Sequence, residues 1–73
     1  MKLYEARRDR LLTQRELGEL SGVSYVTIAR IESGLVVPTL RTIRRLSTAL
    51  NVDPHSIEEF HAAIRGTELA PVV

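Results

Sequence analysis

Residues 25–30 include a set of side chains whose chemistry suits the edges of DNA base pairs. Arginine can donate a bidentate pair of hydrogen bonds to O6 and N7 of guanine, and the methyl groups of valine and threonine can pack on the methyl of thymine. A tyrosine hydroxyl can hydrogen bond a base edge or a phosphate. The residues with this chemistry are Tyr25, Val26, Thr27 and Arg30.

The other reactive residues do not form a catalytic or metal-binding set. The chain has no cysteine, which excludes thiolate ligands, thiol nucleophiles and disulfides. His55 and His61 are not spaced to share one helical face, and no carboxylates join them. Glu58 and Glu59 are adjacent rather than facing, and the contiguous residues 53–56 cannot form a triad. We therefore expect no enzyme activity, no metal and no cofactor.

Basic and acidic residues are unevenly distributed along the chain. The 73 residues include ten Lys and Arg and nine Asp and Glu, for a formal net charge of +1. Residues 1–45 hold nine of the basic and five of the acidic residues, a balance of +4, whereas residues 46–73 have a balance of −3. The near-neutral total therefore conceals a positive N-terminal part, which is compatible with a polyanionic partner.

Length and hydropathy predict one small domain. Dividing 73 residues would leave halves too short for separate cores. No apolar run approaches the roughly 20 residues of a membrane span, and the N-terminus lacks the apolar core of a signal peptide. We therefore expect a cytoplasmic location and no membrane contact.

Capping residues and apolar spacing predict an all-α fold with five short helices. The first helix is expected at about residues 2–11. The second is expected at residues 13–21, because Thr-Gln-Arg-Glu matches a capping box, and Leu20 is expected to face inward. The third is expected at residues 24–33 and the fourth at residues 39–50, each beginning with a hydroxyl residue that can cap it.

A fifth helix is predicted from the capping residue Asp53 to Gly66, which would end it. Its apolar stripe consists of Ile57, Phe60 and Ile64. The helical domain then spans residues 1–66, with the helix pair at residues 13–33, and residues 67–73 are a C-terminal tail without periodicity.

The second and third helices meet the steric demands of a helix-turn-helix. A small residue, Gly18, lies midway along the first of the pair, where the two helices would approach closely. Gly22 can adopt the positive φ that the turn needs, and Val23 can fill the angle between the helices. Ile28 supplies a branched apolar residue for the core side of the second helix.

These residues resemble the lambdoid repressor and Cro type of helix-turn-helix domain, also called the XRE family. The resemblance extends from about Leu3 to Ile57, and the combination of motifs is more specific than any one of them. The motifs are T-Q-R-E-L at 13–17, G-V-S at 22–24, I-A-R-I-E-S-G at 28–34 and P-T-L at 38–40. The chain departs from the family at Gly18, where Ala is usual, and at residues 35–37, which are apolar rather than polar or basic.

The resemblance implies a five-helix, repressor-like bundle that binds double-stranded DNA with its third helix in the major groove. It puts Tyr25, Val26, Thr27 and Arg30 at the positions that contact bases. The positions that contact the DNA backbone are Gln14, Ser24, Ser33, Thr39 and Arg41. It also pairs Arg7 with Glu32 in a buried ion pair that would fix the third helix to the scaffold.

The resemblance further implies a homodimer on a pseudo-palindromic operator. The interface would lie in the C-terminal part and include Val52, Ile57, Phe60 and Ile64. The implied function is sequence-specific transcription regulation by a repressor or autoregulator of the Cro, restriction–modification controller or antitoxin kind, without a small-molecule ligand. The alternative is a protein–protein interaction module that uses the same helical scaffold without binding DNA.

Overall fold

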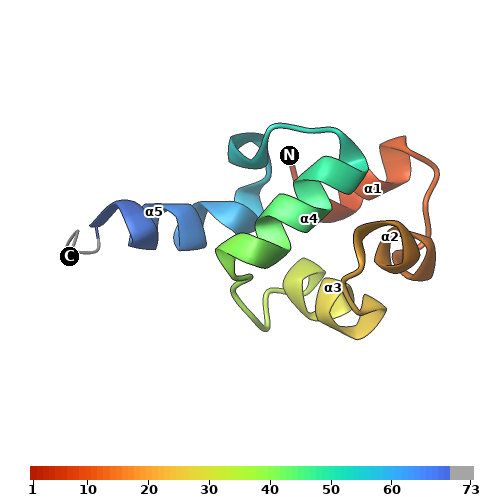
Figure 1. Ribbon diagram of the computed structural model, residues 1–73, viewed down its shortest axis with the longest axis horizontal. Coiled ribbons are helices and arrows are strands. Elements are labelled where there is room, and N and C mark those ends of the chain that lie inside the picture. Colours follow the sequence, from red (N-terminus) through yellow and green to blue (C-terminus); the bar gives the residue numbers. More distant parts are fainter. Residues whose placement is uncertain (70–73) are drawn as a thin grey trace.

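The computed structural model describes residues 1–69, and the side chains of residues 1–66. All regular structure in this range is helical (Figure 1). The elements in chain order are α1 (Leu3–Asp9), α2 (Gln14–Ser21), α3 (Tyr25–Glu32), α4 (Leu40–Leu50), the 3₁₀ turns η1 (Pro54–Ser56) and η2 (Glu58–Phe60), and α5 (His61–Leu69). The predicted all-α class with five helices is confirmed.

The core lies between the first four helices and the two 3₁₀ turns. Ile28 and Ile31, which are three residues apart on α3, are fully buried, so one face of this helix is fixed in the core and the opposite face is turned outward. Leu20, predicted to face inward, is instead exposed on α2. The largest fully buried side chains are Phe60, Leu3, Leu17, Ile28, Ile31, Leu46, Leu50 and Ile57.

Three of the helices begin at the hydroxyl residues predicted to cap them. Thr13 Oγ1 accepts a hydrogen bond from the Glu16 amide at 3.0 Å, and the Glu16 carboxylate accepts one from the Thr13 amide at 2.9 Å. Ser24 and Thr39 accept from the amides two and three residues further on, each at 3.2 Å. These bonds satisfy amides that the first turn of a helix leaves without partners, so they fix the starts of α2, α3 and α4.

The first helix is shorter than predicted, because α1 ends at Asp9. Leu11 has a left-handed backbone with φ of 57°, and 90% of its surface is exposed. Its amide donates to the Arg8 carbonyl at 2.8 Å, and the Leu12 amide donates to the Arg7 carbonyl at 3.2 Å. This is the Schellman pattern that ends a helix, and it normally uses glycine at the position of Leu11.

The predicted start of the fifth helix is wrong. Asp53 does act as a cap, because its carboxylate accepts from the His55 amide at 2.9 Å, but the segment that it caps is the short turn η1. Ile57 then has an extended backbone (φ −99°, ψ 118°), and α5 begins only at His61, after η2. A continuous helix from residue 53 is therefore absent from the described structure.

Contacts with the N-terminal residues account for this break. The Glu58 amide donates to the Met1 carbonyl at 2.9 Å, and the Glu59 carboxylate accepts from the Leu3 amide at 2.8 Å. An amide that bonds a distant segment cannot also make a helical bond to the residue four positions earlier. The Glu58 amide is therefore taken out of a helical ladder, and so is the Ser56 carbonyl, which accepts from the Met1 amino group at 2.7 Å.

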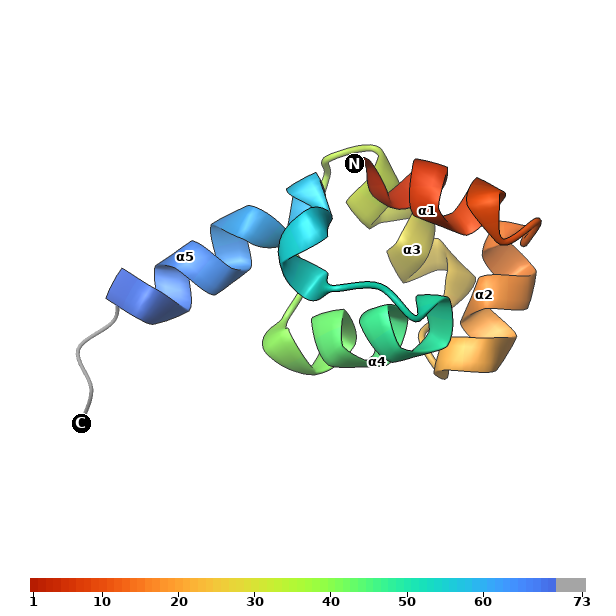
Figure 2. The same ribbon diagram turned by 90° about the horizontal axis from the view of Figure 1, so that it is seen from above.

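The end of the fifth helix also differs from the prediction. Gly66 does not end α5, which continues to Leu69, so residues 67–69 of the predicted tail are helical. The rest of that tail, residues 70–73, lies outside the described residues. Helix α5 extends away from the bundle formed by the other elements (Figure 2).

Candidate nucleic-acid interface

The outward side of α3 carries the residues predicted to contact bases, and we call it the reading face. Tyr25 and Val26 are 42% and 41% exposed, Arg30 is exposed, and Thr27 is half-buried at the edge. The Arg30 guanidinium has no hydrogen-bond or ion-pair partner within the described part of the chain. A helix with an outward guanidinium and adjacent apolar and hydroxyl groups has the donors and methyl groups that base edges require.

A tight junction sets the position of α3 relative to α2. Gly22 ends α2 with a φ of 75°, a conformation that glycine adopts without steric cost. A β-carbon on Gly18 would lie 2.8 Å from the Val23 carbonyl oxygen, so the backbone of the turn passes close to this residue. Val23 itself is part of the buried core. The junction therefore has the close approach and the left-handed turn residue predicted for a helix-turn-helix.

The ion pair expected between the first and third helices is present. Arg7 Nε donates to Glu32 Oε2 at 2.8 Å, and Arg7 Nη2 donates to Glu32 Oε1 at 3.0 Å. The Arg7 and Glu32 side chains are only 12% and 9% exposed. A further donor, Arg7 Nη1, bonds the Leu12 carbonyl at 2.9 Å. The hydrogen bond to Glu32 raises the pKa of Arg7 in opposition to desolvation, so the arginine stays charged and ties the last turn of α3 to α1.

Gln14 is the third member of this cluster, which sequence reasoning did not anticipate. Its Nε2 donates to Glu32 Oε1 at 3.0 Å, so the start of α2 is also tied to the end of α3. The side-chain amide has a second N–H donor that this bond does not use. Gln14 can therefore position α3 and still donate to a phosphate, the contact predicted for it.

Comparison with known families agrees with this geometry. A family model described as helix-turn-helix matches residues 3–57, which is more than half of the chain. The chain belongs to the XRE family of Cro/C1-type helix-turn-helix domains. It is therefore of the DNA-binding transcription-regulator kind. No curated protein and no solved structure was found to match it.

Three of the backbone contacts predicted for this helix-turn-helix domain are hydroxyls that already take part in helix ends. The Ser24 oxygen accepts a bond, so its O–H donor remains available. The hydroxyls of Ser33 and Thr39 donate internally, to a backbone carbonyl at 3.2 Å and to a neighbouring hydroxyl at 3.1 Å. Arg41 is exposed on α4. Ser24 and Arg41 are therefore better placed than Ser33 and Thr39 to donate to a phosphate.

Arg15 lies beside the reading face, although no motif singled it out. Its guanidinium carbon is 4.5 Å from the centre of the Tyr25 ring, and its Nη2 is 3.4 Å from the Tyr25 hydroxyl oxygen. The two residues belong to α2 and α3, so the contact crosses the turn of the helix-turn-helix. No local sequence signal could have indicated it, because it depends on how the two helices pack.

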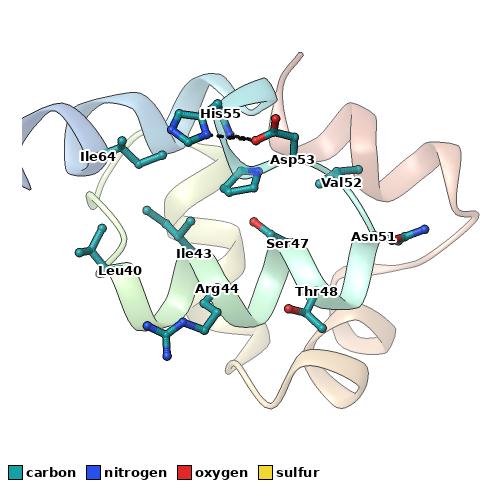
Figure 3. A pocket seen from close by; sticks show the side chains of 11 residues that line it. Leu40, Ile43, Arg44, Ser47, Thr48, Asn51, Val52, Asp53, His55 and Ile64 are labelled. Carbon is teal, nitrogen blue, oxygen red and sulfur yellow. Dashed lines mark hydrogen bonds and ion pairs between the residues drawn. The ribbon is translucent and has the colours of Figure 1, made fainter. Parts of the chain in front are cut away.

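Two of the four residues predicted for a dimer interface are not available to a second chain. Ile57 and Phe60 are fully buried in the core, because the extended residue and the turn before α5 place both side chains inside the bundle. Val52 and Ile64 are half-buried and line a groove of about 660 Å³ between α4 and the η1–α5 segment, together with Leu40 (Figure 3). The predicted interface is therefore wrong at Ile57 and Phe60.

The described residues of the domain contain no group of three or more side chains that could hold a metal ion. Both histidines make local contacts: the His55 ring lies 3.1 Å from Asp53 Oδ1, and His61 Nε2 donates to the His55 carbonyl at 2.8 Å. None of the described helices has both the length and the apolar character needed to span a membrane.

Proposed function

We propose that this domain binds a specific double-stranded operator as a homodimer and represses transcription there, including that of its own gene. The reading face of α3 is the observation that carries the proposal. Its inner side is fixed in the core by Ile28 and Ile31, and its last turn is tied to α1 and α2 through Glu32. A reading helix held in this way can enter the major groove without reorganising, which favours discrimination between base pairs.

The side chains of the reading face suggest a mixed operator. Arg30 can donate a bidentate pair to guanine, and Val26 and the Thr27 methyl can pack against thymine methyls. Gln14, Ser24 and Arg41 would donate to phosphates on either side. The balance of +4 over residues 1–45 puts the positive charge in the segment that would meet DNA.

A second copy of the chain is the proposed occupant of the groove beside α4. Leu40 and Ile64 line this groove. The buried Ser47 hydroxyl, which has no hydrogen-bond partner among the described residues, points into it (Figure 3). Leu35 and Val37, which are also exposed, lie in the connection between α3 and α4, shortly before Leu40 begins α4. An apolar groove edged by an exposed leucine is the kind of surface that marks a protein interface. No α3 residue lines the groove, so dimerisation leaves the reading face uncovered.

Selection of duplexes from a random pool with the full chain tests the DNA-binding proposal. We expect a pseudo-palindromic consensus whose half-sites are about ten base pairs apart, and a dissociation constant that rises steeply with salt. Arg30→Ala should relax the preference at one base pair of each half-site, by about 1–3 kcal/mol. Absence of enrichment together with a flat salt dependence would contradict the proposal and favour a protein-interaction module.

The dimer is tested by sedimentation of the free protein at several concentrations. Leu40→Glu should shift the equilibrium to monomer and weaken operator binding, because it puts a charge into the apolar groove. Leu20→Glu is the matched control, because Leu20 is also an exposed leucine but lies on α2 and does not line the groove. Equal dissociation by the two variants, or a monomeric parent protein on DNA, would exclude this interface.

A further inference from the structure

Arg15 and Tyr25 form a stacked pair across the helix-turn-helix junction. Arg15 is the second residue of α2 and Tyr25 the first residue of α3. The guanidinium carbon lies 4.5 Å from the ring centre, within the range of a favourable cation–π contact. Both side chains are exposed, so the pair forms part of the surface that adjoins the reading face.

The stack leaves the charge of Arg15 available. Unlike Arg7, Arg15 meets no carboxylate in the described part of the chain, and only one of its N–H groups has a partner, the Tyr25 hydroxyl at 3.4 Å. A cation held over a ring keeps its positive charge, because the ring is neutral. The remaining N–H groups at the edge of the guanidinium can still donate to an anion.

A hollow next to the pair offers a place for such an anion. It has a volume of about 400 Å³ and lies between α2 and the start of α3, where Arg15, Ser24 and Tyr25 line it. The Ser24 hydroxyl donates to no group among the described residues, so two kinds of donor converge there. Glu19 also lines the hollow and would oppose an anion, which predicts that Arg15 is needed to offset it.

We infer that Arg15 binds a backbone phosphate of the operator and that its stack on Tyr25 fixes how Tyr25 presents its hydroxyl to the base pair at the end of each half-site. The inference rests on the proposed function. A phosphodiester oxygen is the anion that the reading face would bring to this hollow, because phosphates flank every base pair that α3 contacts. Arg15 is then a positioning residue for Tyr25 as well as a phosphate ligand, and it affects sequence preference without contacting a base.

Operator binding at a series of salt concentrations tests the phosphate contact. Arg15→Gln should weaken binding to unrelated duplex roughly tenfold at low salt and lower the slope of log affinity against log salt by about one. Operator binding should weaken by more than that factor, because the preference at one base pair is reduced as well. Arg65→Gln removes the same charge from α5 and should change neither quantity. Glu19→Gln should strengthen binding to both duplexes. An unchanged slope for Arg15→Gln, beside a steep slope for the parent protein, would overturn the inference, whereas a flat slope for the parent would overturn the proposed function itself.

A double-mutant cycle tests the positioning role. Arg15→Gln and Tyr25→Leu should each reduce the preference at the same base pair, and the double variant should lose no more of that preference than Tyr25→Leu alone. Tyr25→Phe keeps the stack but lacks the hydroxyl, so it should lose the preference while retaining the full salt slope. Independent, additive losses of preference from Arg15→Gln and Tyr25→Leu would overturn the coupling. Circular dichroism of each variant should show unchanged helix content.

Discussion

Arg7 on α1 and Glu32 at the end of α3 meet through two hydrogen bonds, of 2.8 and 3.0 Å, with both side chains largely removed from water. The two residues are 25 positions apart in the sequence. Because Glu32 is the last residue of α3, the pair holds the reading helix at the end opposite to Tyr25. Gln14 adds a bond to the same carboxylate, so three helices converge on one buried charge.

Removal of this charge should destabilise the domain strongly. Glu32→Gln leaves Arg7 buried without its anion, which costs about 3–5 kcal/mol in comparable cases. A core of this size supplies about the same free energy, so we expect the variant to be largely unfolded at room temperature. Urea unfolding followed by circular dichroism measures the loss. Unchanged stability together with unchanged operator affinity would contradict the role given to the pair.

Gln14→Ala tests the bond from Gln14 to Glu32 without breaking the Arg7–Glu32 ion pair. It removes one hydrogen bond to a charged group, so the loss should be only about 1.5–3 kcal/mol and the Arg7–Glu32 pair should remain. We expect operator and unrelated duplexes to be bound more weakly by a similar factor, because the contact predicted for Gln14 is to a phosphate. A selective loss at one base pair would instead indicate that Gln14 acts on sequence preference.

Leu11→Gly should stabilise the domain by about 1 kcal/mol. Leu11 is held at a φ of 57°, which costs an L-residue roughly 1–2 kcal/mol, and its exposed side chain contributes almost no burial. Asn51→Gly is the matched control: Asn51 caps α4 at a φ of 54°, but asparagine tolerates this region, so its gain should be a few tenths of a kcal/mol at most. Thermal unfolding measures both. Equal gains would mean that strain at Leu11 is not the cause.

The two helical glycines Gly18 and Gly66 should respond to alanine with opposite signs. At Gly18 the added carbon would lie 2.8 Å from the Val23 carbonyl oxygen, and a shift of the turn should cost about 1–3 kcal/mol, more than the helix propensity gained. At Gly66 nothing lies within 4 Å, so alanine should stabilise α5 by up to about 1 kcal/mol. Chemical denaturation of both variants checks the signs. A stabilising Gly18→Ala would show that the junction can open without loss.

Acid should weaken the capping box of α2. The Thr13 backbone amide, followed by the Thr13 hydroxyl, holds the pKa of Glu16 below its ordinary value. A carboxylate whose pKa is depressed in the folded state stabilises the fold at pH values above its ordinary pKa. This stability is lost as the pH falls from about 5 through the depressed pKa. Glu16→Gln can keep the reciprocal bond without titrating, so its stability should depend less on pH between about 5 and 3. An equal loss of stability in the two proteins over this pH range would contradict the prediction.

Local signals predicted the starts of α2, α3 and α4 correctly, whereas the last part of the chain was predicted poorly. Thr13, Ser24 and Thr39 cap amides within three residues of themselves, so their effect does not depend on the rest of the fold. Asp53 gave an equally good signal, and it does cap. The helix it was expected to begin is interrupted because the Ser56 carbonyl and the Glu58 amide bond the N-terminal segment instead.

The sequence by itself determined the all-α class, the helix-turn-helix and the Arg7–Glu32 pair, the last through the family resemblance, because these depend on periodicity, on caps and on a specific motif. Only the tertiary structure decided that Ile57 and Phe60 belong to the core, that Gln14 bonds Glu32 and that Arg15 stacks on Tyr25. The physical reason is the distance along the chain over which each interaction acts. A cap or an apolar stripe acts over one or two helical turns, whereas each of these contacts joins segments whose approach is set by the packing of the whole bundle.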